Sequence, residues 1–253
     1  MIIIEEKTIR NIKMTMQYDG TGYNGWQIQG NTSNTIQGRL TELLSAVCGD
    51  SIELIGSGRT DKGVHAFNQI ANFKTKSDIS VELLKESLNQ KLRNDISIKS
   101  IAEAAPRFHA RYNAIGKKYL YRVWNQPYVN VFERKYSCHV NERLNIDAMR
   151  TAAVLFVGAH DFLGFSSLGK SNKSTVRIIY GIDVLEKNGI VEIMCHGNSF
   201  LYNMVRIIAG TLIEIGLGQM DIKAVKEVLQ HKERAKAGFT APPHGLFLSE
   251  VFY

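Results

Sequence analysis

The stretch GSGRTDKGVHAF, residues 56–67, places one aspartate, Asp61, between two cationic side chains, Arg59 and Lys62. Neighbouring cations favour the charged form of a carboxyl group, so we expect Asp61 to be ionised. An ionised carboxylate can attack a sugar carbon as a nucleophile, as it does in retaining glycosidases. The chemistry open to this stretch is therefore nucleophilic catalysis at a sugar.

A plain β-turn over residues 60–63 is the alternative, because aspartate and glycine are routine in turns. Such a turn does not require Gly56 and Gly58 upstream, which suggest that another backbone or a ligand approaches closely. An ionised carboxylate is also misplaced in a groove that binds a polyanion, unless it has a chemical role. On these residues alone, both interpretations stay open.

A second candidate site is the segment 107–135, in which cationic and aromatic side chains are interleaved and Glu133 is the one acid. Its basic residues are Arg107, Arg111, Lys117, Lys118, Arg122, Arg134 and Lys135, and its aromatic residues are Phe108, Tyr112, Tyr119, Tyr121, Trp124, Tyr128 and Phe132. Cations for phosphates and rings for unstacked bases are typical of a nucleic-acid groove. The alternative is a strand with a solvated basic face and an aromatic core face.

An acid-free patch at 166–177 adds Lys170, Lys173 and Arg177, and we expect it to form a mobile polar loop. The whole chain of 253 residues has 31 lysines and arginines against 24 aspartates and glutamates, a net charge of +7. This balance favours association with a polyanion.

Other features of the sequence exclude several protein classes. The first ten residues hold no secretory apolar region, and no run reaches the roughly 18 uncharged apolar residues of a membrane helix. The cysteines at 48, 138 and 195 lie far apart, which argues against a disulfide framework or a zinc site. We expect a cytoplasmic, metal-free protein.

These side chains must be positioned by a fold, and hydrophobic periodicity predicts its elements. In the first half, the pattern predicts strands at 12–18, 52–56, 68–73 and 96–101, with helices that begin after Thr35 and Ser80. The order is β-α-β-β-α-β.

The second half repeats this pattern. It predicts a strand at 117–124, a helix capped by Asn145, a hairpin with an Asn188-Gly189 turn, a helix at 200–216, a short helix near 222–230 and a closing strand at 245–253.

The sequence therefore predicts an α+β fold of two ferredoxin-like (split βαβ) halves. They would form an extended antiparallel sheet with helices on one face, and a cleft between the halves. We expect an N-terminal domain at 1–105, which carries Asp61, and a C-terminal domain at 106–253.

Seven blocks, in order, resemble the tRNA pseudouridine synthase A family. They are YDGTGYNGWQIQ (18–29), TIQGRLTELLSAVCG (35–49), GRTDKGVHA (58–66), RFHARYNAIGKKYLYRV (107–123), HDFLGF (160–165), GNSFLYNMVRIIAGTLIEIG (197–216) and APPHGLFL (241–248). The resemblance spans nearly the whole chain, and the block around Asp61 is very specific.

This resemblance implies isomerisation of uridine to pseudouridine at positions 38–40 in the anticodon arm of tRNA. It implies no cofactor and no metal. It also implies a homodimer of two-halved subunits, with each active site in the cleft between the halves.

The resemblance also implies a role for five residues. Asp61 matches the catalytic aspartate, and Arg59 matches a basic residue that holds the substrate in place. Tyr119 matches a tyrosine that stacks on the target uracil and assists proton transfer at C5. Arg206 matches an arginine that pairs with the aspartate, and Leu246 an apolar residue on the other side of the base. Without the family motif, Tyr119 and Leu246 would be interpreted as core residues.

The remaining candidates for tRNA contact are cationic: Lys62, Arg107, Arg111, Lys118 and Arg177. Lys62 stands where bacterial members of the family usually carry a small residue, and we expect it to contact a phosphate. Asn24 and Gly164 also differ from the residues common in their blocks, which leaves local substrate contacts open.

Two rival functions are considered. A non-catalytic RNA-binding module would suit the interleaved cations and rings, but it gives no reason for Asp61 together with Arg206. A small-molecule enzyme such as a phosphate-ester hydrolase would need a glycine-rich loop that opens a helix, or a metal cluster, and neither pattern is present in the sequence.

Overall fold

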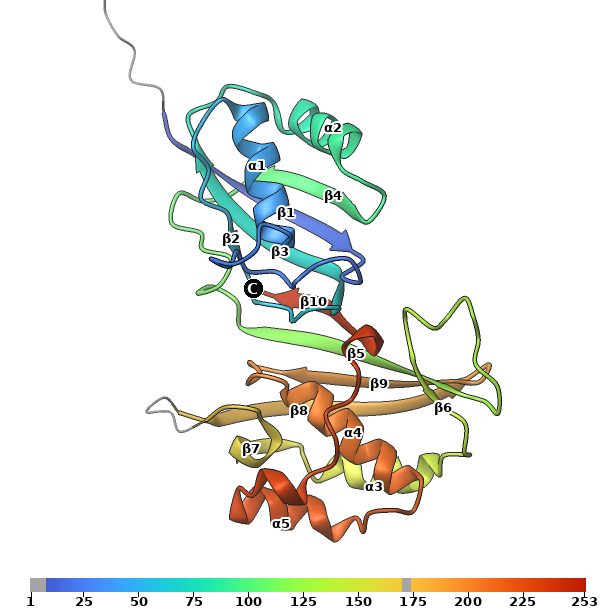
Figure 1. Cartoon of the computed structure of the whole chain (residues 1–253). Helices are drawn as coiled ribbons and strands as arrows, with labels where there is room; N and C mark the ends of the chain where they lie inside the picture. The colour runs from blue at the N-terminus through green and yellow to red at the C-terminus, as the bar shows by residue number, and fades with distance from the viewer. Residues whose placement is uncertain (1–7, 170–173) are drawn as a thin grey trace, which may run out of the picture. The chain divides into compact units, whose positions relative to one another are not determined.

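The computed structural model describes residues 8–169 and 174–253, and its chain divides into two compact units. The first unit contains Met1–Ala114 together with Tyr253, and the second contains Ile115–Phe252. Each unit combines an antiparallel sheet with helices, so the α+β class expected from the sequence is confirmed (Figure 1).

The first unit holds the predicted six elements in the predicted order. They are β1 (Arg10–Tyr18), α1 (Ile36–Cys48), β2 (Ile55–Gly56), β3 (His65–Thr75), α2 (Val81–Lys91) and β4 (Ile96–Glu103). The strand order is β4-β1-β3, with β2 on the other edge of β3, and all three pairings are antiparallel. This is the strand order of a ferredoxin-like fold.

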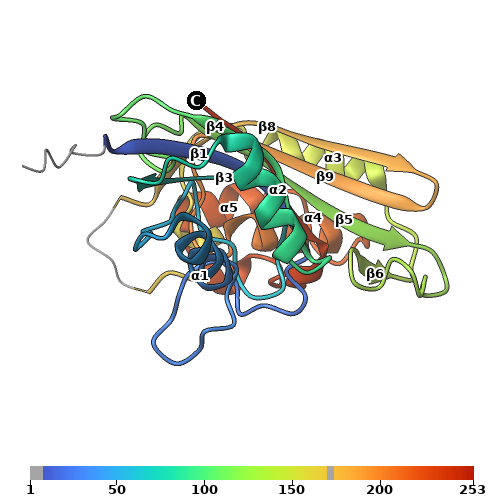
Figure 2. The same cartoon turned by 90° about the horizontal axis from the view of Figure 1, so that it is seen from above.

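The helices of the first unit begin where the sequence predicts. The side chains of Thr35 and Ser80 accept hydrogen bonds from the backbone N–H groups of Gly38 and Leu83, which caps α1 and α2. Figure 2 shows both helices on the same side of β1 and β3. Alternate residues of β1, among them Met14 and Met16, are fully buried in the core.

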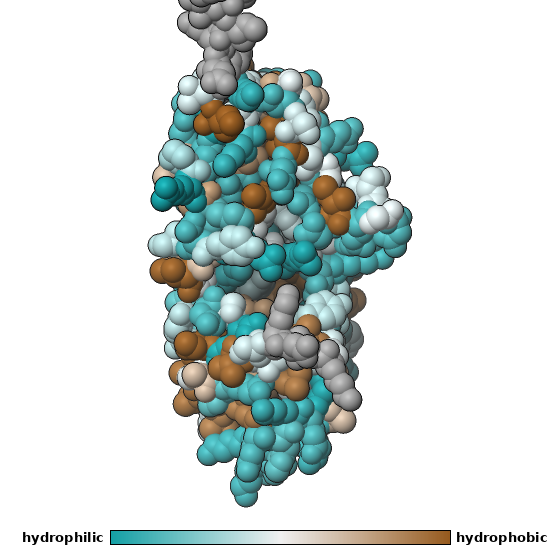
Figure 3. Space-filling model, turned by 90° about the vertical axis from the view of Figure 1, so that its left-hand side faces the viewer, coloured by the Kyte–Doolittle hydropathy of each residue, from teal (hydrophilic) through white to brown (hydrophobic). Residues whose placement is uncertain are grey.

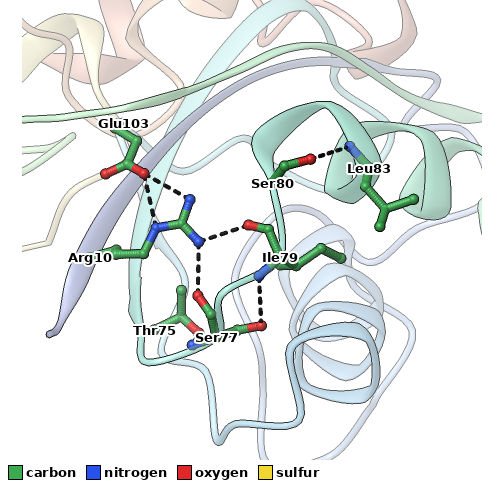
Figure 4. Close-up of polar contacts among 7 residues, drawn as sticks. All are labelled: Arg10, Thr75, Ser77, Ile79, Ser80, Leu83 and Glu103. Atoms are coloured by element: carbon green, nitrogen blue, oxygen red, sulfur yellow. Dashed lines mark hydrogen bonds and ion pairs between the residues drawn. The ribbon is translucent and has the colours of Figure 1, made fainter. Parts of the chain in front are cut away.

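An arginine clamp joins the edge of this sheet to the start of α2 (Figure 4). Arg10 on β1 bonds Glu103 on β4 at 2.7 Å and donates to the carbonyl oxygens of Ser77 and Ile79 at 2.8 and 2.7 Å. These carbonyls belong to the connection between β3 and α2, so one side chain fixes the entry into the helix.

The second unit contains the predicted elements and two further short strands. Its elements are β5 (Gly116–Asn125), β6 (Cys138–Val140), α3 (Ile146–Val154), β7 (Gly158–Asp161), β8 (Val176–Lys187), β9 (Ile190–Gly197), α4 (Met204–Gly216), α5 (Lys223–His231) and β10 (Leu246–Phe252). Short 3₁₀ turns lie at Leu163–Phe165, Arg234–Lys236 and Pro243–Gly245.

The strand order in the second unit is β10-β5-β9-β8-β7, and β6 adds to β5 in parallel. Without β6 and β7, this is again the ferredoxin-like order, with β5, β8, β9 and β10 as its four strands. The hairpin turn at Asn188 and Gly189 has positive φ at both residues, +52° and +78°, as expected for a type I′ turn.

Three expectations differ in detail from the structure. The helix expected at 200–216 begins at Met204, because Asn203 adopts a left-handed conformation with φ of +60°. The strand expected at 52–56 is reduced to Ile55–Gly56. The short strands β6 and β7 were not expected, since three or four residues are too few for a periodic signal.

Candidate active site

Asp61 lies in the loop between β2 and β3, and the residue before it is held from two sides. The hydroxyl groups of Thr60 and Tyr18 are 2.8 Å apart and buried. The backbone N–H of Trp26 donates to the carbonyl oxygen of Thr60 at 3.0 Å. Thr60 is therefore fixed by both its side chain and its carbonyl group, which fixes the backbone of Asp61.

Glycines of the segment YDGTGYNGW allow this loop to approach. A Cβ atom on Gly25, whose φ is +90°, would lie 2.7 Å from the carbonyl oxygen of Thr60. A Cβ atom on Gly20 would lie 2.1 Å from the carbonyl oxygen of Val64. Both separations are too short for any residue with a side chain, so two backbones touch here.

The segment before Asp61 is held by local contacts. A Cβ atom on Gly56 would lie 2.6 Å from the ring of Trp26, so the close neighbour expected there is an indole ring. The carbonyl oxygen of Gly58 accepts a hydrogen bond from Nε2 of Gln69 at 3.0 Å, and Oε1 of Gln69 accepts one from Ser57 at 2.7 Å. Buried polar contacts thus fix the loop along its length.

The loop also contains the β-turn that formed the alternative interpretation. The backbone N–H of Val64 donates to the carbonyl oxygen of Asp61 at 3.1 Å, and Gly63 has φ of +77°. The Asp61 side chain is half-buried, while Arg59 and Lys62 are exposed. The turn thus presents a partly shielded carboxylate beside two solvent-exposed cations.

In the second unit, Tyr119 and Leu246 share one face of the sheet. Strand β5 pairs with β10 so that Tyr119 lies opposite Leu248 and Tyr121 opposite Leu246. Tyr119 and Leu246 are therefore diagonal neighbours on the same face. Both are buried, and the ring of Phe200 meets that of Tyr119 edge to face at 5.2 Å.

Arg206 is held in the first turn of α4 by contacts with the segment that leads into β10. Its Nε donates to the carbonyl oxygen of Ala241 at 2.7 Å, and its backbone carbonyl accepts from Ala241 N–H at 3.1 Å. A second guanidinium nitrogen donates to Oδ1 of Asn203 at 2.8 Å. Next along the chain, the carbonyl oxygen of Pro242 accepts a hydrogen bond from Tyr121 at 2.9 Å. Hydrogen bonds thus fix both Arg206 and the segment that leads into β10.

Comparison with known proteins identifies the family. Residues 14–113 and 152–253 match the family model described as tRNA pseudouridine synthase. The chain belongs to this family.

Three relatives agree with this assignment over almost the full length of both chains. A protein named tRNA pseudouridine synthase A 2 from Bacillus cereus (strain ATCC 14579) is 49% identical over 96% of this chain and 99% of its own. Proteins named tRNA pseudouridine synthase A from Bacillus sp. (strain KSM-64) and Ruminiclostridium cellulolyticum are 46% and 44% identical, each over 97% of this chain and 100% of its own. The family isomerises uridine to pseudouridine in tRNA, so the chain is an isomerase with a tRNA substrate.

The cationic residues expected to bind tRNA differ in their exposure and in their bonding partners in this pseudouridine synthase. Arg107 and Arg111 are exposed, as are Arg59 and Lys62. Lys118 pairs with Glu250 at 3.4 Å and lies over the ring of Phe252. Arg177 donates to two backbone carbonyl groups, and burial lowers its pKa. Lys170 and Lys173 lie outside the described residues.

Sequence reasoning missed the residues that support the site. Tyr18, Trp26 and Thr60 occur in the synthase motifs, but their roles depend on contacts between segments 34 to 42 positions apart, which no local pattern reveals. His65, four residues after Asp61, is buried, with Nδ1 3.1 Å from both Gly20 N and Asp19 Oδ1.

Two of the three residues that depart from the family pattern, Asn24 and Gly164, have structural explanations. The Asn24 side chain donates to Thr32 at 3.1 Å and its backbone bonds Asn34, which closes the loop before α1. A Cβ atom on Gly164 would lie 2.8 Å from the Val228 side chain, so glycine allows close packing on α5.

No group of three or more His, Cys, Asp or Glu side chains that could hold a metal ion occurs within 8–169 and 174–253. In the same part of the chain, no helix is long and apolar enough to cross a membrane.

Proposed function

We propose that Asp61 is the catalytic carboxylate of a synthase that modifies uridines 38–40 in the anticodon arm of tRNA. The observation that carries this proposal is the clamp on Thr60, because it gives the backbone of Asp61 a fixed position without using the carboxylate itself. Preorganisation of this kind is what a catalytic group requires.

The reaction exchanges one bond between base and sugar for another. The N1–C1′ glycosidic bond breaks, the uracil turns in the site, and a C5–C1′ bond forms. The hydrogen on C5 is lost as a proton, and N1 gains a proton. In this proposal, Asp61 acts on the ribose or the base when the glycosidic bond breaks, and Arg206 pairs with the Asp61 carboxylate.

Tyr119 and Leu246 would hold the detached uracil. Their placement as diagonal neighbours on one sheet face supports this role. The Tyr119 hydroxyl group would assist removal of the C5 proton, and Leu246 would pack on the opposite face of the base. A uracil inside a stem must first be flipped out at a cost of a few kcal/mol, and stacking in the site offsets part of that cost.

The exposed cations would supply the rest of the binding energy through tRNA phosphates. Arg59 would hold the nucleotide beside Asp61, and Lys62, Arg107 and Arg111 would contact the backbone nearby. Lys118 and Arg177 are weaker candidates, since each already has partners within the second unit. We further propose that the enzyme works in the cytoplasm as a homodimer.

The test is release of tritium from tRNA transcripts that carry uridine labelled at C5. Wild type is expected to release tritium, and folded Asp61→Ala is expected to bind the same tRNA but to release tritium at least about 10³-fold more slowly. Transcripts with uridine at only one of positions 38, 39 and 40 would test the assignment of the target. Release from positions outside this group alone would overturn it.

The non-catalytic RNA-binding module is the competing outcome of the same experiment. It predicts tight tRNA binding by both wild type and Asp61→Ala, with no tritium release from either.

A further inference from the structure

Tyr112 is an exposed aromatic residue with a supported ring. Its exposed fraction is 77%, and one ring face lies on the ring of His109, with centroids 4.2 Å apart and planes 27° from parallel. The stack leaves the opposite face of Tyr112 available to solvent.

Hydrogen bonds lock the turn that carries this pair. The backbone N–H of His109 donates to Oδ1 of Asn113 at 2.7 Å, and the Asn113 N–H returns a bond to the His109 carbonyl oxygen at 3.0 Å. Nδ1 of His109 lies 3.2 Å from the backbone nitrogens of both Arg111 and Tyr112, and accepts from them. The histidine ring is therefore held in place as a support for Tyr112.

The turn is also anchored on the sheet of the first unit. Ala110 is fully buried, its N–H donates to Oδ1 of Asn72 on β3 at 2.8 Å, and its carbonyl oxygen accepts from Tyr253 at 2.8 Å. The Asn11 side chain, on β1, donates to the carbonyl oxygen of Phe108 at 2.9 Å. Hydrogen bonds to β1, β3 and Tyr253 thus fix the turn that carries the His109–Tyr112 stack.

The charge around the stack is positive. Residues 104–113 contain two arginines, Arg107 and Arg111, and no aspartate or glutamate. Both arginines are exposed. A supported ring with two exposed cations shortly before it in the chain fits an unstacked nucleobase with its phosphates better than it fits an apolar protein surface.

We propose that the stack of His109 and Tyr112 binds an unpaired nucleobase of the tRNA other than the target uridine. The inference rests on the tRNA-modifying function proposed above and adds a second contact to it. The base lies on the free face of Tyr112, and Arg107 and Arg111 contact the flanking phosphates. Because the turn is formed before tRNA binds, little conformational entropy is lost when the base stacks.

Other exposed surfaces support no comparable inference. Tyr128 and Phe132 are exposed to 85% and 86%, but the contacts described for their segment include no ring stacked beneath either of them. On the face of the molecule drawn in Figure 3, hydrophobic residues form patches separated by hydrophilic ones, which does not favour a broad apolar docking surface there.

The test is the affinity for a full-length tRNA transcript, measured by fluorescence anisotropy at several salt concentrations, beside tritium release at saturating tRNA. Tyr112→Ala is expected to weaken binding about 5- to 150-fold without changing the salt slope, and Tyr112→Phe to bind like wild type. Arg111→Ala is expected to lower the salt slope by about 1. Tritium release at saturating tRNA is the second readout, and it separates a loss of binding from a loss of catalysis.

Tyr180→Ala is the matched control, because Tyr180 is also exposed beside a histidine but meets His196 edge-on at 69°. It should leave tRNA affinity unchanged.

Wild-type tRNA affinity in folded Tyr112→Ala, with normal tritium release by wild type, would overturn the stacking site and leave the proposed function intact. Weaker binding by Tyr112→Ala with no tritium release from wild type would support the stacking site and overturn the function. If Tyr112→Ala changed the mass measured by sedimentation but kept the tRNA affinity of wild type, this surface would be a protein contact, and the proposal would be overturned.

Discussion

The hydroxyl group of Tyr18 lies 2.8 Å from Oγ1 of Thr60, so the last residue of β1 holds the residue that precedes Asp61. Nε2 of Gln69 is 3.4 Å from the same hydroxyl group, and the three side chains are buried. Burial raises the pKa of Tyr18, which keeps the phenol neutral and able to donate a hydrogen bond. The position of Asp61 therefore depends on the interior of the sheet.

Tyr18→Phe is expected to lower the free energy of unfolding by about 1–2 kcal/mol, since it removes the hydrogen-bond partner of the buried Thr60 hydroxyl group. It should also lower the maximal rate of tritium release while tRNA affinity is unchanged, because Thr60 loses one of its two anchors. Urea unfolding and single-turnover kinetics measure the two effects. Tyr23→Phe is the control: its hydroxyl group bonds Asp95 at 2.9 Å, so it should lose similar stability and keep its rate. Equal rates for the two variants would contradict a role for Tyr18 in positioning Asp61.

Gly25→Ala is expected to displace the Asp61 loop at its contact with the segment before α1. The new Cβ atom would lie 2.7 Å from the carbonyl oxygen of Thr60, at a backbone φ of +90° that alanine rarely adopts. We expect a loss of about 2 kcal/mol or more in the free energy of unfolding, and a reduced rate at temperatures where the variant is folded. Gly22→Ala is the matched control, since a Cβ there meets no atom within 4 Å and the residue is exposed. If both alanine variants kept full activity, close approach at Gly25 would have no functional importance.

Arg206→Lys tests whether charge alone is enough at the start of α4. Lysine keeps the positive charge but cannot reproduce the bonds from the guanidinium group to Ala241 and Asn203 together. We expect the maximal rate to fall about 10²-fold, because displacement of a positioning group by about 1 Å has effects of this size. Arg150→Lys is the control, since Nε of Arg150 also donates to a backbone carbonyl group, that of Val184, at 3.0 Å. A rate for Arg206→Lys near that of Arg150→Lys would show that only the charge matters.

The ferredoxin-like arrangement of four strands in each unit could be predicted from sequence, because the long strands and helices carry strong periodicity and capping residues such as Thr35 and Asn145. The short strands β6 and β7 of the second unit could not. Family motifs predict Asp61, Tyr119 and Leu246 as site residues, and the Asp61→Ala experiment tests the first of these three roles. The anchors of the Asp61 loop could not be predicted. The bond between Tyr18 and Thr60 joins residues 42 positions apart, and nothing in either local pattern distinguishes it from ordinary core packing.

Lys62 offers a separate test of how the Asp61 loop meets tRNA. Its side chain is exposed, one residue after the proposed catalyst, where a phosphate contact would bring the tRNA backbone close to the carboxylate. Lys62→Ala is expected to weaken tRNA binding and to lower the slope of log affinity against log salt by about 1, because one counterion fewer is released. Lys226→Ala, which removes an exposed lysine from α5, controls for the change in net charge and should leave the slope unchanged. If Lys62→Ala kept both the affinity and the slope of wild type, Lys62 would have no phosphate contact, and the electrostatic attraction at this loop would rest on Arg59.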